Sequence, residues 1–219
     1  MKFARNSALL IAALIMMIGL SACNDSQVET PKSDAPVEQG EAEKAPKTED
    51  QSAIASNDDA MSDLDDTLYL DLKDGRVTIK LRPDLAPKHV AQIKALTKKG
   101  FYDGIVFHRV IDGFMAQTGD PTGTGMGGSD LPDLPAEFSE EPFARGVVGM
   151  ARSQDPNSAN SQFFIMFEQG DFLNGQYTVF GEVADGMEHV DKIKRGEGQN
   201  GMVDGPDKIV KMQLASDAN

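Results

Sequence analysis

Residues 107–120, FHRVIDGFMAQTGD, place one arginine and one glutamine among aromatic and aliphatic residues. Arg109 lies in the first of two short apolar runs, and Gln117 lies in the second. A guanidinium stays charged and holds its N–H donors in a rigid plane, so it can stabilise a reacting group that becomes a better hydrogen-bond acceptor. The stretch is therefore our first candidate for a functional site.

Alternation in these runs predicts what surrounds the guanidinium, because residues two apart on a strand share a face. The shared faces pair Phe107 with Arg109, Met115 with Gln117 and, further along the chain, Gln162 with Phe164. Phe114 would lie on the opposite face or on a turn, and the segment DFLNGQY adds Phe172, Leu173 and Tyr177. The result would be an apolar pocket with a guanidinium and two amides at its edge. Periodicity alone allows an alternative, an arginine on the solvent side of an edge strand.

A glycine-rich motif, GTGMGG at residues 123–128, matches the G-x-G-x-x-G pattern of dinucleotide-binding sites. That pattern requires a preceding strand and a helix that opens at its last glycine, but SDLPDLPAEF follows here with two prolines. Without a helix N-terminus there is no natural position for a phosphate. We interpret the motif as a flexible loop beside a binding groove.

Other residue types give no support to metal or hydrolytic chemistry. The histidines His89, His108 and His189 are far apart in the sequence and have no cysteine near them, so no metal site and no cofactor is expected. His108 is expected to be a structural residue that is hydrogen-bonded within the domain. Ser158 and Ser161 lie outside any G-x-S-x-G motif.

The elements that must position these residues begin at Thr67. Alternating runs at 67–72 and 75–81 are joined at Asp74-Gly75, which favours a tight hairpin turn. Residues 87–100 predict a helix with proline in its first turn and glycine after its end, and residues 185–196 predict a second, shorter helix. Six further β-like runs lie at 105–110, 113–119, 146–152, 161–167, 177–183 and 208–214. Many short strands with two helices favour a closed barrel or a sandwich.

The N-terminus has the pattern of a secretory signal. Lys2 and Arg5 precede an apolar run at 8–20, which is too short to span a bilayer comfortably. It ends in LSAC, which resembles the bacterial lipobox, whose cysteine is lipidated and becomes the new N-terminus. We therefore expect residues 1–22 to be a lipoprotein signal peptide and Cys23 to carry lipid; the alternative is an ordinary signal peptide with a chance cysteine. Cys23 is the chain's single cysteine, so no disulfide explains it.

The negative charge of the protein is concentrated in the segment that follows Cys23. Residues 24–66 hold 13 acids and 3 bases and contain no aromatic residue, whereas residues 67–219 hold 22 acids and 16 bases. A segment of this composition cannot bury enough apolar surface to fold, so residues 23–66 are predicted to be the lipidated cysteine followed by a disordered acidic linker. Nucleic acid is not an expected partner, because phosphate binding requires a basic face.

Three stretches together resemble the cyclophilin family of peptidyl-prolyl cis-trans isomerases: residues 107–128, residues 146–165 (GVVGMARSQDPNSANSQFFI) and residues 172–183 (FLNGQYTVFGEV). The resemblance covers residues 67–219. It implies a mainly β domain, an eight-stranded antiparallel closed barrel capped by two helices, with the active groove on its outer face.

The resemblance also assigns roles to residues of this chain. Arg109 falls on the catalytic arginine of the family, and Gln117 is our candidate for the amide that holds it. The implied proline pocket consists of Phe114, Met115, Phe164 and Leu173, with Gln162 as a polar contact and the backbone of Ala151 and Arg152 along the substrate. Together with Phe107, Phe172 and Tyr177 these complete the predicted substrate-binding set.

The implied chemistry explains why these residue types are needed. Rotation of an X-Pro amide is slow because the nitrogen lone pair is delocalised into the carbonyl. An apolar pocket around the proline ring favours the twisted amide, whose nitrogen is a better acceptor for a guanidinium N–H. No covalent bond forms or breaks, and no cofactor is required.

Departures from familiar eukaryotic members lie at the edge of the pocket. Phe172 stands where many carry tryptophan, Tyr177 where many carry histidine, and Arg152-Ser153 where Asn-Ala is usual. Cyclosporin binding, which depends on the tryptophan, is put in doubt, whereas isomerase activity is not.

We therefore expect a monomeric, membrane-anchored lipoprotein of the cell envelope with its domain in the periplasm, in the inner or the outer membrane. It would accelerate X-Pro isomerisation in proline-containing segments of exported proteins during folding. The alternative is a non-catalytic chaperone or envelope assembly component that binds proline-containing segments.

Overall fold

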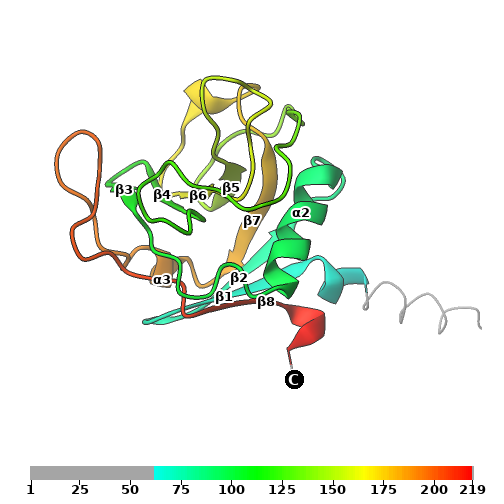
Figure 1. The fold of residues 1–219 in the computed structure, drawn as a ribbon, viewed down its shortest axis with the longest axis horizontal. Helices are drawn as coiled ribbons and strands as arrows, with labels where there is room; N and C mark the ends of the chain where they lie inside the picture. The colour runs from blue at the N-terminus through cyan, green and yellow to red at the C-terminus, as the bar shows by residue number, and fades with distance from the viewer. Residues whose placement is uncertain (1–61, 219) are drawn as a thin grey trace, which may run out of the picture. The chain divides into compact units, whose positions relative to one another are not determined.

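The computed structural model describes residues 62–218. The predictions for residues 1–22, for Cys23 and for most of the acidic linker lie outside the described residues. These residues form eight strands, one longer helix and a few single helical turns. Figure 1 shows how they are arranged. In chain order the elements are β1 (Thr67–Leu72), β2 (Gly75–Leu81), α2 (Pro87–Lys98), β3 (Arg109–Ile111), β4 (Met115–Thr118), β5 (Val147–Met150), β6 (Phe163–Met166), η1 (Asp171–Leu173), β7 (Val179–Asp185), α3 (Met187–Val190), β8 (Lys211–Leu214) and η2 (Ala215–Asp217).

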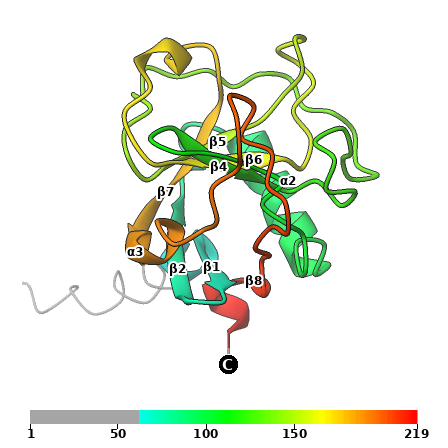
Figure 2. The ribbon, with the colours of Figure 1, turned by 90° about the vertical axis from the view of Figure 1, so that its left-hand side faces the viewer.

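All eight strands belong to one antiparallel sheet, in the order β3-β4-β6-β5-β7-β2-β1-β8. The predicted mainly β fold with eight antiparallel strands is confirmed. In Figure 2, β4, β5 and β6 lie above β1, β2 and β8, with β7 between the two groups. The edge strands of the sheet are β3 and β8. No ladder between them is seen in the described residues. Instead, the segments before them close the gap, with Gly104 N–H donating to Ile209 O at 2.8 Å and Phe107 N–H to Asp207 O at 2.9 Å.

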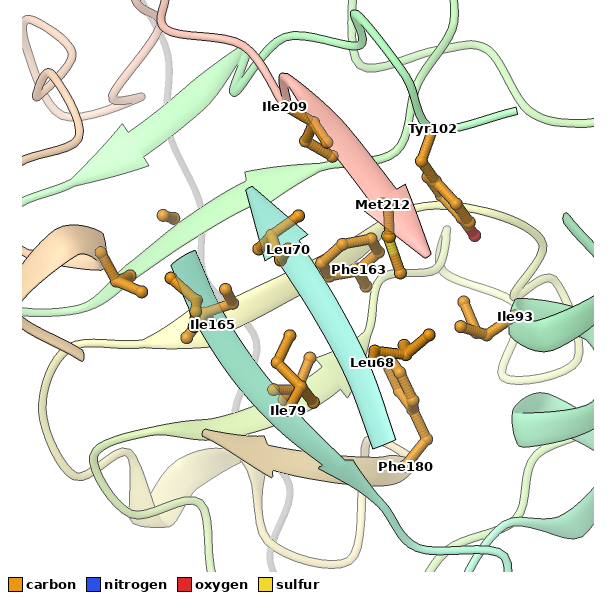
Figure 3. Close-up of a cluster of buried hydrophobic side chains, with 14 of the residues drawn as sticks. Leu68, Leu70, Ile79, Ile93, Tyr102, Phe163, Ile165, Phe180, Ile209 and Met212 are labelled. Atoms are coloured by element: carbon orange, nitrogen blue, oxygen red, sulfur yellow. The ribbon is translucent and has the colours of Figure 1, made fainter. Parts of the chain in front are cut away.

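The β1–β2 hairpin forms as its alternating pattern predicts. Leu68 pairs with Ile79 and Leu70 with Val77, and all four side chains are buried. The register pairs Leu72 with Gly75, so the turn residues are Lys73 and Asp74, one position earlier than expected from the Asp-Gly dipeptide. Figure 3 shows the main apolar core, in which side chains from both strands meet Phe163, Phe180 and Met212.

Helix α2 presents Val90, Ile93 and Leu96 to the core, as the sequence predicts. It packs against β8 and β7, and in both views it lies on the opposite side of the curled sheet from α3 (Figures 1 and 2). Within residues 62–218, no helix combines the length and the apolar character needed to cross a membrane.

The second predicted helix, residues 185–196, is much shorter than expected. Only Met187–Val190 is helical, and the chain continues in tight turns in which Lys192 N–H donates to His189 O and Ile193 N–H to Val190 O. The next N–H, that of Lys194, donates to the Asp207 carboxylate at 2.8 Å. A tertiary acceptor therefore competes with the helix at this point, which periodicity cannot reveal.

The last residues of the predicted linker contact the domain. Residues 62–65 form a helical turn. The Asp63 carboxylate pairs with Lys80, and the Asp66 carboxylate accepts a hydrogen bond from Lys94 Nζ at 2.5 Å. These contacts attach the chain to β2 and α2 just before the expected domain boundary at Thr67.

Candidate active site

Arg109 and Gln117 face each other across the pair β3–β4, where they are register partners. Arg109 Nη1 donates to Gln117 Oε1 at 3.1 Å. Two side chains eight positions apart in the sequence are therefore brought together by a tight antiparallel connection around Gly113, whose φ is +67°. The strand pairing itself sets the relative position of guanidinium and amide.

A chain of side-chain amides continues from this pair. Gln117 Nε2 donates to Gln162 Oε1 at 2.9 Å, and Gln162 Nε2 donates to the carbonyls of Gly125 at 3.1 Å and Gly127 at 2.8 Å. A guanidinium can only donate and a backbone carbonyl can only accept. The groups at the two ends of this row of hydrogen bonds therefore fix the orientation of both amides.

The second edge of the guanidinium is also held. Arg109 Nε donates to the backbone carbonyl of Asn200 at 3.1 Å. Among residues 62–218, Nη2 has no hydrogen-bond partner. Burial lowers the pKa of the Arg109 guanidinium, and Tyr177 opposes that effect. An arginine side chain does not lose its proton in proteins near neutral pH, so the group remains charged.

A pocket of about 240 Å³ lies beside the guanidinium. Its base is apolar and nearly inaccessible to solvent: Met115 is 1% exposed, Phe164 is 5% exposed and Leu173 is 5% exposed. Phe172 is 65% exposed and covers one side, with its ring centroid 5.3 Å from that of Phe114. The complete lining is Arg109, Phe114, Met115, Gln117, Ala151, Arg152, Phe164, Phe172, Leu173 and Tyr177.

The structure therefore brings together nearly all of the predicted site residues, with two exceptions. Gln162 lies outside this pocket and reaches Arg109 only through Gln117. Phe107 is wrong as a groove residue, because it is fully buried in the main core. The prediction assumed a regular strand from residue 105, but β3 begins at Arg109, so the alternation of faces does not extend back to Phe107.

A larger, more polar pocket of about 660 Å³ adjoins the first and shares Gln117, Ala151 and Arg152 with it. Gln162, which the sequence predicts to belong to the substrate-binding set, also lines this pocket. Sequence reasoning missed other walls, among them Met126, which is 91% exposed, and Asn160. The glycine-rich motif was the available signal, since it supplies one wall of this pocket: Gly125, Met126, Gly127 and Gly128.

The glycine-rich loop is held around the carboxylate of Asp120, not left free. The N–H groups of Thr122, Thr124 and Gly125 donate to that carboxylate at 2.8, 3.1 and 2.6 Å, and the Thr122 hydroxyl donates at 2.8 Å. Burial acts to raise the pKa of Asp120, but these donors, led by Thr122, bring it down to about 2. The motif lies beside a pocket, as the sequence predicts, and the N–H groups of Thr124 and Gly125 within it bind an internal anion.

His108, next to the catalytic candidate, has no hydrogen-bond partner for either ring nitrogen within the described part of the chain. The hydrogen bonds predicted for a structural histidine are therefore not formed with good geometry, although the Val106 backbone acts on the ring and partly opposes the effect of burial on its pKa. Burial lowers the pKa of His108, so the ring is neutral at pH 7. Among residues 62–218, no three histidine, cysteine or acidic side chains gather where they could hold a metal ion.

Arg152 forms the rim between the two pockets. Its guanidinium lies over the Tyr177 ring at 4.5 Å from the centroid, and Nη2 donates to Gln176 O at 2.9 Å. The backbone N–H of Ala151 donates to Gln162 O at 2.9 Å. Hydrogen bonds therefore attach the rim both to the backbone of Gln162 and to the segment that carries Phe172 and Tyr177.

Comparisons with known proteins agree with this geometry. Residues 67–214 match the family model described as cyclophilin type peptidyl-prolyl cis-trans isomerase/CLD. A probable peptidyl-prolyl cis-trans isomerase of Brucella suis is 62% identical over 168 residues, which cover 71% of this chain and 86% of the relative. The human peptidyl-prolyl cis-trans isomerase-like 3 is 42% identical over 133 residues, covering 59% and 81% of the two chains.

Comparison with solved structures also points to the cyclophilin family. The cyclophilin AquaCyp293 from Hirschia baltica superposes with a TM-score of 0.65 at 30% identity, covering 72% of this chain and 76% of that one. A Cryptosporidium parvum cyclophilin type isomerase, crystallised in the presence of the dipeptide Ala-Pro, gives a TM-score of 0.63 at 30% identity, covering 68% and 98%. The chain belongs to the cyclophilin-type peptidyl-prolyl cis-trans isomerases.

Proposed function

We propose that this isomerase uses Arg109 as its catalytic residue and Gln117 to orient it, and that it acts on proline-containing segments of exported proteins from a lipid anchor at Cys23. The observation that carries the catalytic part is the hydrogen bond of 3.1 Å from Arg109 to Gln117 at the edge of an apolar pocket. It combines a fixed charge with a surface that can bind a proline ring.

The pocket and the guanidinium have separate roles in this proposal. The apolar base formed by Met115, Phe164 and Leu173 binds the pyrrolidine ring through burial of apolar surface. As the amide twists, its nitrogen regains a lone pair, and an Arg109 N–H donates to it more strongly than to the planar amide. A millionfold acceleration requires about 8 kcal/mol of such differential stabilisation.

The substrate class follows from the site and from a relative. The Cryptosporidium parvum structure was obtained in the presence of Ala-Pro. The pocket here is small, apolar at its base and polar along the side formed by Arg109 and Gln117, which suits one proline ring with its flanking peptide groups. Alanine before the proline is therefore the first substrate to use.

The envelope location rests on the N-terminal sequence. The apolar run that ends in LSAC supports cleavage before Cys23 and lipidation of its sulfur. The acidic segment after it, taken as a flexible coil, would span about 35 Å and would keep a monomeric domain away from an anionic membrane surface. From that position the enzyme would meet unfolded segments of newly exported proteins, whose X-Pro bonds isomerise slowly.

The catalytic proposal is tested with the full chain and an Ala-Pro peptide, by exchange NMR or a protease-coupled assay. Arg109→Ala should lower kcat by orders of magnitude while the protein stays folded. The matched control is Arg76→Ala, because Arg76 pairs with Asp71 on the β1–β2 hairpin and lies outside the pocket. A rate equal to wild type in Arg109→Ala would refute the role of Arg109.

The location is tested separately by growth with an alkyne fatty acid, followed by membrane fractionation. The wild type should carry the label and sediment with membranes, whereas Cys23→Ser should be unlabelled. Ser21→Ala is the control, since it changes the same motif without removing the sulfur. An unlabelled wild type would refute the anchor and leave the catalytic proposal untouched.

A further inference from the structure

The segment 196–203, in the loop between α3 and β8, lies along β3, the strand that begins with Arg109. In Figure 1 this loop runs orange to red beside the β3 label. Gly196 N–H donates to Val110 O at 2.9 Å, and Val110 N–H donates to Gly201 O at 2.7 Å. Val203 N–H adds a bond to His108 O at 3.1 Å. The segment therefore binds the backbone on both sides of Arg109, although it forms no regular strand.

One carbonyl of this segment reaches the guanidinium itself. Asn200 O accepts from Arg109 Nε at 3.1 Å, while Gln117 Oε1 accepts from Nη1, also at 3.1 Å. A planar group held at two of its nitrogens cannot turn about its own bonds without losing one of the two acceptors. The remaining nitrogen, Nη2, has no partner within residues 62–218, so its two N–H groups and the second N–H of Nη1 are available to a bound peptide.

The position of Asn200 depends on the glycine that follows it. Gly201 has a φ of +65° and is buried. A Cβ on Gly201 would lie 2.4 Å from Ile111 Cγ1 and 2.9 Å from Val110 O. Gly196 is equally restricted, since its Cβ would lie 1.9 Å from Gly201 O. Any side chain at these positions must push the segment away from β3 and carry Asn200 O away from Arg109.

We propose that the backbone carbonyl of Asn200 is a second positioning group for the catalytic guanidinium, and that Gly201 places it by having no side chain. This inference rests on the proposed catalytic role of Arg109. A group that orients Arg109 without touching the substrate should affect turnover and leave peptide affinity nearly unchanged.

The chain offers a closely matched pair of variants. Gly198 has a φ of +67°, almost equal to that of Gly201, and nothing lies within 4 Å of a Cβ built on it. Gly201→Ala and Gly198→Ala therefore introduce the same unfavourable backbone conformation in the same loop. Only Gly201→Ala also introduces a collision with β3. Any difference in kcat between the two variants is therefore due to the close packing that positions Asn200.

Three quantities should be measured for both variants in the full chain: kcat on an Ala-Pro peptide, affinity for that peptide, and the Arg109 Nε–Hε NMR resonance, assigned by its loss in Arg109→Lys. Gly201→Ala should lower kcat by about tenfold or more, keep the affinity within about twofold, and shift the resonance. Gly198→Ala should match the wild type in all three quantities.

Several results would overturn the inference. One is a Gly201→Ala variant with wild-type kcat; another is a fall in kcat without a shift of the Nε–Hε resonance; a third is an affinity loss as large as the loss in kcat. Arg109→Ala, measured in parallel, separates this inference from the proposed function: if that variant retains full activity, the role of Arg109 itself is wrong.

A measurement on the wild type covers the case in which Gly201→Ala does not fold. The Arg109 Hε proton should exchange with solvent much more slowly than that of free arginine, because it is hydrogen-bonded to Asn200 O. Exchange as fast as in free arginine would contradict the bond on which the inference depends.

Discussion

The carboxylate of Glu137 lies 2.7 Å from Nδ1 of His89, which is completely buried in the first turn of α2. Because a carboxylate can only accept, the ring carries its proton on Nδ1. The same carboxylate accepts the backbone N–H groups of Lys88 and His89 at 3.1 and 3.2 Å. One side chain, 48 positions from His89, therefore caps the helix and satisfies Nδ1 of a buried histidine.

Glu137→Ala should lower the free energy of unfolding by about 2 kcal/mol, because it removes a helix cap and leaves the buried His89 donor without an acceptor. Urea unfolding at pH 7 measures the change. Glu140→Ala is the control, since Glu140 is exposed and lies on the same loop. Equal stability of the two variants would contradict the capping role.

Gln117→Leu should lower kcat on an Ala-Pro peptide by about tenfold, since it removes one of the two acceptors that hold the Arg109 plane. Peptide affinity should stay within about twofold, because the apolar base of the pocket is unchanged. Gln169→Ala, which alters a surface amide paired with Asp171, serves as the control. If affinity falls as much as kcat, Gln117 binds substrate instead of orienting Arg109.

Asp120→Asn should change how stability depends on pH. The pKa of Asp120 is lowered to about 2 in the folded protein and is about 3.9 in an unfolded chain. The ionised carboxylate therefore stabilises the fold above about pH 4, and this contribution of about 3 kcal/mol is lost as the pH falls toward 2.

Urea unfolding of Asp120→Asn and wild type at pH 7, 4 and 2.5 tests this expectation. The wild type should be more stable at pH 7, and the difference should shrink at the lowest pH. Asp112→Asn is the control, because the Asp112 side chain is 83% exposed. A difference that does not vary with pH would show that the donors of the loop do not depend on the charge of Asp120.

Phe172→Trp should increase inhibition by cyclosporin, because the resemblance to the cyclophilin family implies that this inhibitor binds through a tryptophan at this position. The wild type should be inhibited weakly, and the variant about tenfold more strongly, because the larger ring adds apolar contact and an N–H donor at the exposed side of the pocket. Phe138→Trp is the control, since Phe138 is an exposed aromatic residue that does not line the pocket. Equal inhibition of all three proteins would contradict the role of residue 172 in cyclosporin binding.

The alternating runs and the resemblance were sufficient to predict eight strands, α2 and most of the pocket, because each depends on residue types at fixed spacing. Arg109, Gln117 and the residues that line the pocket lie on or next to regular elements or on the short segment that carries Phe172. Phe107 was assigned incorrectly because its alternation was extended beyond the start of β3.

The features that the sequence did not predict depend on contacts between residues that are distant in the sequence. Glu137 caps a helix from a distant loop, and Asn200 contributes a backbone carbonyl, which every residue type possesses. The contraction of α3 depends on Asp207, which reaches Lys194 from another segment. Such contacts leave no local periodicity in the sequence. Only the glycines of the segment 196–203 give a trace of the close approach to β3.

The distance in sequence between Arg109 and Asn200 has a consequence for synthesis of the protein. Their contact spans 91 positions, and the carbonyl lies close to the C-terminal end of the domain. A chain still emerging from the ribosome, or one truncated before Asn200, lacks one of the two acceptors of the Arg109 guanidinium. Full positioning of the guanidinium therefore requires synthesis to pass Asn200, about 90 residues after the arginine itself.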